Sequence, residues 1–184
     1  MGEYKTVLAD PPWPYHQQLG RGKSVGDKTR GGLPYISMSI EQIASLPVST
    51  LADKDTMLFL WTTNSHLHEA FHVMESWGFK YKTTMTWAKT QIGLGYWLRG
   101  QTEHLLLGVI GNPRSGMIGP YGATGKSWST LVTAKRGLHS VKPQIVIDMI
   151  EDISVPPRIE LFARQKRLGW HVWGSEVDSD ISLN

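Results

Sequence analysis

A short stretch near the start of the sequence, VLADPPWPYH at residues 7–16, joins an acid, prolines and an aromatic residue to an apolar run. Its first three residues predict a short buried strand. Pro11 and Pro12 lack a backbone N–H, and each holds the residue before it in an extended conformation, so the strand must end at Asp10. The stretch therefore predicts a rigid turn that presents a carboxylate, backbone carbonyls without adjacent donors, and the flat ring of Trp13.

These groups suit the activation of an amino group on a flat base. The amino nitrogen of adenine is a poor nucleophile, because its lone pair is delocalised into the ring. If Asp10 and the carbonyl of Pro11 accept both amino hydrogens, the lone pair becomes localised, and Trp13 can clamp a base that has left its stack. The prolines keep these acceptors preorganised. Asp10 would also lie favourably near a sulfonium cation, and the carboxyl end of a strand is where open α/β sheets bind ligands.

Two other motifs resemble known sites but fit them poorly. HEAFH at residues 68–72 matches the HExxH zinc pattern. The apolar stripe of that helix predicts that His68, Glu69 and His72 point away from the core, so we expect no metal site. PYGATGKS at residues 120–127 resembles a phosphate-binding P-loop, but a proline replaces the first glycine and a strand is expected to follow instead of a helix.

The composition indicates an ordinary globular protein with a mildly basic charge. The 184 residues include 40% hydrophobic and 19% charged residues, and a net charge of +3 is compatible with nucleic-acid binding. Basic residues cluster at 21–30 and 164–167. The absence of cysteine excludes disulfides and thiol catalysis. Neither a membrane-length apolar run nor a secretory signal is present, so we expect a soluble, cytoplasmic protein without a membrane partner.

The predicted elements alternate between strands and helices. Strands are expected at residues 5–9, 56–61, 79–89, 103–111, 128–133, 158–163 and 170–174. A capping box at Ser39 and Gln42 predicts a short helix, and longer helices are expected at 65–77 and from Pro143 onward. The apolar stripes of the two longer helices are Leu67, Ala70, Phe71 and Met74, and Ile145, Val146, Met149, Ile150 and Ile153. This order predicts a three-layer α/β fold in a single domain, residues 1–184.

A family resemblance is carried by motifs along nearly the whole chain. DPPW after an apolar strand resembles the catalytic tetrad of the MT-A70 family of adenine-N6 methyltransferases. The similarity continues through LPY (33–35), LPV (46–48), LFLW (58–61), WGF (77–79), TWAK (86–89), EHLLLGVIGNP (103–113), SVKP (140–143), RIELFAR (158–164) and GWHVWGSE (169–176). The resemblance implies a Rossmann-like methyltransferase fold, permuted so that the catalytic strand precedes the cofactor-binding strand. It also implies S-adenosylmethionine as the cofactor and direct methyl transfer to adenine N6.

The resemblance also assigns roles to individual residues. It makes Asp10, Pro11, Pro12 and Trp13 catalytic. Lys142 matches a lysine that pairs with the cofactor carboxylate, and Glu160 and Arg164 match residues around the ribose and adenosine. Glu103 matches an acid between cofactor and substrate. The set expected to bind the cofactor is Asp10, Lys142, Glu160, Arg164, Ser175 and Glu176, and the set expected to bind substrate is Tyr15, Arg21, Lys23, Tyr35 and Glu103.

The chain departs from the family pattern at two places. Lys166 and Arg167 stand where the mRNA-methylating subunit has a histidine and an asparagine that hold the cofactor. Ser175 stands where relatives often have an asparagine, and its shorter side chain is expected to reach the ribose less well. Both departures bear on cofactor affinity and leave the chemistry of Asp10 unchanged.

Three functions remain open from the sequence. The first is methylation of adenine N6 in DNA, which the small size of the chain favours. The second is methylation of adenine in RNA, and the third is a catalytically silent scaffold that binds nucleic acid and supports a partner. Without a visible target-recognition insertion, specificity must come from short loops, a homodimer or partner subunit, or a single-stranded substrate.

Overall fold

The computed structural model describes residues 2–14, 37–95, 97–113, 125–137 and 141–183. These residues form seven strands: β1 (Tyr4–Ala9), β2 (Ala52–Thr63), β3 (Lys80–Lys89), β4 (Thr102–Ile110), β5 (Leu131–Ala134), β6 (Arg158–Leu161) and β7 (His171–Trp173). They also form three α-helices: α1 (Ile40–Ala44), α2 (Leu67–Ser76) and α3 (Gln144–Ile153). Short 3-10 turns occupy Val48–Thr50 and Asn64–His66.

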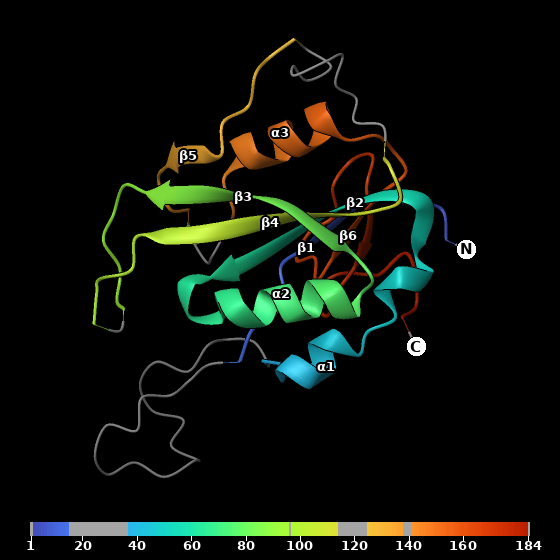
Figure 1. Ribbon diagram of the computed structural model, residues 1–184, viewed down its shortest axis with the longest axis horizontal. Coiled ribbons are helices and arrows are strands. Elements are labelled where there is room, and N and C mark those ends of the chain that lie inside the picture. The colour runs from blue at the N-terminus through green and yellow to red at the C-terminus, as the bar shows by residue number, and fades with distance from the viewer. Residues whose placement is uncertain (1, 15–36, 96, 114–124, 138–140, 184) are drawn as a thin grey trace.

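The strands make one mixed sheet in the order β5-β3-β4-β2-β1-β6-β7 (Figure 1). β1 is parallel to both β2 and β6, and β4 runs antiparallel to β2 and β3. The chain leaves β1 toward β2 on one side, whereas β6 leads to β7 on the other, so strand order reverses between β1 and β6. Ligands of open α/β sheets bind outside the carboxyl ends of strands at such a switch point.

Helices cover both faces of the sheet, which makes three layers (Figure 1). On one face, α1 and α2 bury Ile43, Ala70 and Met74 in a cluster with Val7, Leu58 and other strand residues. On the opposite face, α3 packs in a second cluster, which contains Leu8, Phe59, Trp61 and Leu105. The α/β fold expected from the sequence is confirmed. The single domain and the permutation stay predictions, the latter because it depends on which strand binds the cofactor.

The predicted elements differ from the observed ones in small shifts. The capping box is present, with the Ser39 hydroxyl accepting from the Gln42 backbone and the Gln42 side chain accepting from the Ser39 backbone. Ile145 was wrongly placed in the buried stripe of α3: it is exposed, and Ile147 is buried in its place. The strand expected at residues 128–133 begins later, at Leu131. Within the described part of the chain, none of the helices combines the length and apolarity that crossing a membrane requires.

Candidate active site

The turn after β1 has the rigid form that its prolines predict. Trp13 donates its backbone N–H to the carbonyl of Pro11 at 2.8 Å, and Met38 donates to the carbonyl of Pro12 at 2.9 Å. The expectation that these carbonyls lack nearby donors is therefore wrong. Each carbonyl oxygen still has a second lone pair, so Pro11 remains able to accept one further hydrogen bond.

Trp13 is anchored on several sides. Its indole N–H donates to the carbonyl of Trp61 at 3.0 Å, and its ring stacks on His66 with centroids 5.8 Å apart. The His66 Nε2 lies 2.7 Å from the carbonyl of Pro14. Trp13 is only 8% exposed. It fixes the turn that carries Asp10, and its role as a base clamp stays a prediction.

Strand alternation places the candidate residues on the face covered by α3. Side chains two residues apart in a strand share a face, so Asp10 follows Leu8, and Glu103 precedes Leu105, which both belong to the α3-side cluster. Because β4 is antiparallel to its neighbours, Glu103 at its start pairs with Thr63 at the end of β2. Glu103 therefore lies at the same edge of the sheet as Asp10, the residue that follows β1.

An ion-pair network joins these side chains. Lys142, two residues before α3, places its Nζ 2.7 Å from the Asp10 Oδ2 and 3.4 Å from the Glu103 Oε2. Glu103 also accepts from the Nζ of Lys89 at 2.6 Å. The Lys142 Nζ lies 5.3 Å from the ring centroid of Trp61, a cation–π distance. The network connects residues 10, 89, 103 and 142, and it arranges two carboxylates and two ammonium groups in alternation.

The network shifts the pKa values of its members. Burial favours the neutral amine of Lys142, but the charges of Asp10 and Glu103 outweigh it and raise the pKa of Lys142. Burial likewise favours the neutral acid of Glu103, yet Lys142 and Lys89 prevail and lower its pKa. Both groups are therefore held in their charged forms at neutral pH.

Glu160 on β6 lies beside this network. It pairs in register with Leu8 of β1, which places it on the α3 face. Burial raises the pKa of Glu160, partly offset by Arg167, and the charge of Asp10 adds to the rise. The Arg167 Nε is 3.6 Å from the Glu160 Oε2, beyond hydrogen-bond distance, and among the described residues this buried oxygen accepts no hydrogen bond.

The other residues assigned to the cofactor lie near the ends of β6 and β7. The Arg164 Nε is 3.5 Å from the Glu176 Oε1, and both side chains are substantially exposed. Ser175 is exposed next to Glu176. Lys166 pairs with Asp180 at 3.0 Å. Arg164, Ser175 and Glu176 are thus close to the switch point but outside the buried network.

Four of the residues predicted to bind substrate, and part of one rejected motif, lie outside the described residues. Tyr15, Arg21, Lys23 and Tyr35 lie outside the described residues. His68 and His72 are exposed on α2, as their position off the apolar stripe predicts. The P-loop-like segment lies partly outside the described residues, and the strand β5 follows it instead of a helix.

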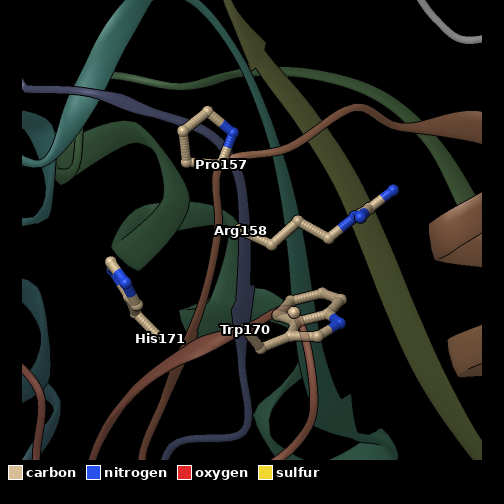
Figure 2. A pocket seen from close by; sticks show the side chains of 5 residues that line it. Pro157, Arg158, Trp170 and His171 are labelled. Atoms are coloured by element: carbon tan, nitrogen blue, oxygen red, sulfur yellow. The ribbon is translucent and has the colours of Figure 1, made fainter.

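A shallow pocket occurs at the opposite edge of the sheet (Figure 2). It is lined by Pro157, Arg158, Gly169, Trp170 and His171. Arg158 begins β6 and His171 begins β7, so this pocket lies at the amino ends of strands whose carboxyl ends approach Asp10. It is separate from the candidate site.

Sequence reasoning missed three residues of the site, and it placed a fourth, Arg167, at a cofactor-holding position without identifying its partner. Lys89, Trp61 and His66 contact the predicted residues, and Arg167 faces Glu160. A usable signal existed for Lys89 and Trp61, because each ends a motif, TWAK or LFLW, just before a predicted loop. His66 and Arg167 carry no local pattern that indicates a partner.

Comparison with known proteins agrees with this geometry. Residues 4–176 match the MT-A70 family. The chain is 31% identical over 198 residues to the Type II methyltransferase M.MunI from Mycoplasma sp, covering 98% of this chain and 81% of that protein. It is 30% identical over 189 residues both to the N(6)-adenosine-methyltransferase catalytic subunit METTL3 from Homo sapiens and to an MT-A70-like protein from Drosophila melanogaster. These alignments cover 97% of this chain but less than a third of either eukaryotic protein, 29% and 28%. The chain therefore belongs to the MT-A70 family, and the Rossmann-like methyltransferase fold expected from its motifs is confirmed.

Proposed function

We propose that this protein is an S-adenosylmethionine-dependent methyltransferase that acts on N6 of adenine in DNA. The observation that carries the proposal is the position of Asp10. It follows β1 at the switch point, adjoins the Pro11 carbonyl, and is paired to Lys142 within a partly buried network. A carboxylate and a carbonyl held rigidly side by side match the two hydrogens of an exocyclic amino group.

The chain's residues fit the cofactor in charge and in hydrogen-bonding capacity. The ammonium of Lys142 suits the cofactor's carboxylate, and Asp10 suits a positively charged sulfur. The unbonded Oε2 of Glu160 is a buried acceptor that a ribose hydroxyl would satisfy. When bound, S-adenosylmethionine supplies an electrophilic methyl group.

The protein's part in the reaction is to bind, orient and activate the amino group. Asp10 and the Pro11 carbonyl accept its hydrogens, which directs the nitrogen lone pair away from the ring. Lys142 and Glu103 hold the Asp10 carboxylate in place, so little reorganisation is needed at the moment of reaction. Trp13 and its partner His66 fix the turn, and this keeps the two acceptors at a constant separation.

DNA is the preferred substrate because of the relative that matches this chain over most of both lengths. That relative is named a Type II methyltransferase, a class that acts on DNA. RNA is the second candidate, since adenosine, the ribonucleoside, appears in the names of the eukaryotic relatives. A silent scaffold is less well supported, because the acid and aromatic residue of DPPW are both present.

The test is transfer of labelled methyl from S-adenosylmethionine to single-stranded DNA, duplex DNA and RNA of one sequence. We expect N6-methyladenine in DNA, and a fall of at least about a hundredfold in rate for Asp10→Asn. Asp10→Asn preserves the shape of the side chain, and an unchanged melting temperature would exclude misfolding as the cause. Equal rates for wild type and Asp10→Asn would contradict the mechanism. If the wild-type protein without a partner transfers no methyl group, that result would favour the scaffold function or a required partner subunit.

A further inference from the structure

The hairpin between β3 and β4, residues 90–101, presents an unusual set of side chains. Trp97 is fully exposed, at 105% of its reference area, and Ile92, Leu94 and Leu98 are also exposed. Large apolar side chains gathered in solvent commonly mark a binding surface. Backbone hydrogen bonds order the hairpin: Gly93 donates to Gly100 at 2.7 Å, and Gly100 donates to Leu94 at 3.2 Å.

The hairpin continues the two strands that carry part of the site. β3 ends at Lys89 and β4 begins next to Glu103, and these two side chains pair at 2.6 Å. In Figure 1 the hairpin extends beyond the end of β3, at the carboxyl edge of the sheet. Asp10 follows β1 at this same edge, because β1, β2 and β3 run in the same direction. A nucleic-acid chain that places one base near Asp10 can therefore contact the hairpin with its neighbouring nucleotides.

The charge of the sequence segment that contains the hairpin indicates the kind of ligand. Residues 76–147, which include β3, β4 and β5, contain nine Lys and Arg residues and a single acid, Glu103. The net charge of this segment, +8, exceeds the +3 of the whole chain, so the other residues together are net negative. Near the hairpin, Arg99 is exposed, as are Lys135 and Arg136, which follow the pairing of Ala134 with Lys89. Exposed cations beside an exposed indole suit a phosphate backbone with accessible bases.

We infer that the hairpin is a stacking platform for single-stranded nucleic acid, with Trp97 packing on an unpaired base next to the target adenine. This inference rests on the proposed function and names the form of its substrate. A duplex is less suitable, because the faces of its bases are already covered by stacking. A second copy of this chain is also less suitable, because a symmetric contact would bring Arg99, Lys135 and Arg136 of both copies together.

The experiment measures binding of a fluorescent oligothymidine of about twelve nucleotides by anisotropy. Oligothymidine contains no adenine, so its binding is independent of methyl transfer, and failure of the proposed function would be seen separately in the transfer assay. We expect Trp97→Ala to weaken binding at least about fivefold and Trp97→Phe to stay within about twofold of wild type. Leu168→Ala is the matched control, because Leu168 is equally exposed but lies between β6 and β7.

Three results would overturn the inference. The first is absence of oligothymidine binding by the wild type, and the second is equal affinity of wild type and Trp97→Ala. The third comes from sedimentation: a wild-type dimer that becomes a monomer in Trp97→Ala would identify the hairpin as a protein contact. Tighter binding of single strands than of duplex of the same length is expected and would support it.

Discussion

The carboxylates of Glu103 and Glu160 lie on the same face of the sheet and are affected by their surroundings in opposite directions. The pKa of Glu103 is lowered because Lys142 and Lys89 outweigh its burial, whereas burial raises the pKa of Glu160. A lowered pKa means that folding favours the charged form, so Glu103 stabilises the fold above its ordinary value of 4.5. That contribution is lost as the pH falls through the lowered value.

This sign gives a prediction for Glu103→Gln. The variant should melt at a lower temperature than wild type near pH 7, and the difference should shrink as the pH falls below 4.5, the ordinary pKa of the carboxyl group. Glu160→Gln tests the opposite sign. Ionisation of Glu160 opposes folding, so the variant should not lose stability at neutral pH as Glu103→Gln does. Melting temperatures of both variants and wild type across the acid range test these expectations. A loss of melting temperature in Glu103→Gln that does not change with pH would contradict the proposed role of the Glu103 charge.

At the scale of elements, the connection between β6 and β7 depends on a close backbone approach. The carbonyl of Trp173 accepts from the N–H of Ala163 at 2.9 Å, which holds the ends of the two strands together. A Cβ on Gly174 would meet the carbonyl oxygen of Ala163 far inside van der Waals contact. Glycine at this position therefore lets the chain turn directly into Ser175 and Glu176.

We expect Gly174→Ala to lower the melting temperature and to weaken binding of S-adenosylmethionine, because it separates the ends of β6 and β7. Gly169→Ala is the control, since Gly169 has a φ of 79° and open space around it. That substitution meets only the left-handed backbone penalty, about 1–2 kcal/mol. Calorimetry measures both effects, and a Gly174→Ala variant no less stable than Gly169→Ala would disprove the close-approach argument.

The sequence predicts elements better than it predicts their contacts. Apolar runs and breakers located each strand of the described residues. They did not settle which side of α3 is buried, because residues 145 and 147 are both isoleucine and lie about 200° apart around the helix. Periodicity alone cannot choose between them, because docking on the sheet decides which is buried. The late start of β5 has a similar origin, since the indole N–H of Trp128 donates to Asp152 on α3 at 2.6 Å.

The same distinction applies to the site. Asp10 and Lys142 could be predicted from sequence motifs, whereas their pairing across 132 residues follows from the fold. The pairing of Lys89 with Glu103 depends on the antiparallel direction of β4, which no local pattern specifies. The partner of Glu160 could not be predicted from the sequence either, because Arg167 lies in a connection without periodic structure.

At the scale of the whole molecule, positive charge is concentrated in one segment of the sequence, residues 76–147. A net charge of +3 describes this poorly, because residues 76–147 alone contain nine basic residues and one acid. Affinity for a polyanion depends on which cations contact phosphates, and each such contact adds to the salt dependence of binding.

Two double variants with the same change in net charge test this distribution. Lys135→Glu with Arg136→Glu alters the basic segment, and Lys5→Glu with Lys54→Glu alters exposed positions elsewhere. We expect the first pair to weaken nucleic-acid binding about tenfold or more and to reduce the salt slope by about two. The second pair should change both quantities much less. Equal losses in both variants would indicate that net charge, and not its position, governs binding.

The place of β1 in the sheet has a consequence for how the protein is made. Residues 6–9 of this strand pair with residues 158–161 of β6, which lie far from them in the sequence. During synthesis, β1 can pair with β2 early, but its other edge has no partner until β6 has left the ribosome. Such distant pairing slows folding, because a long loop must close before the contact forms. Asp10 therefore leaves the ribosome well before Arg158–Leu161 of β6, which completes the switch point beside it, so a nascent chain carries its proposed catalytic acid before it has a site.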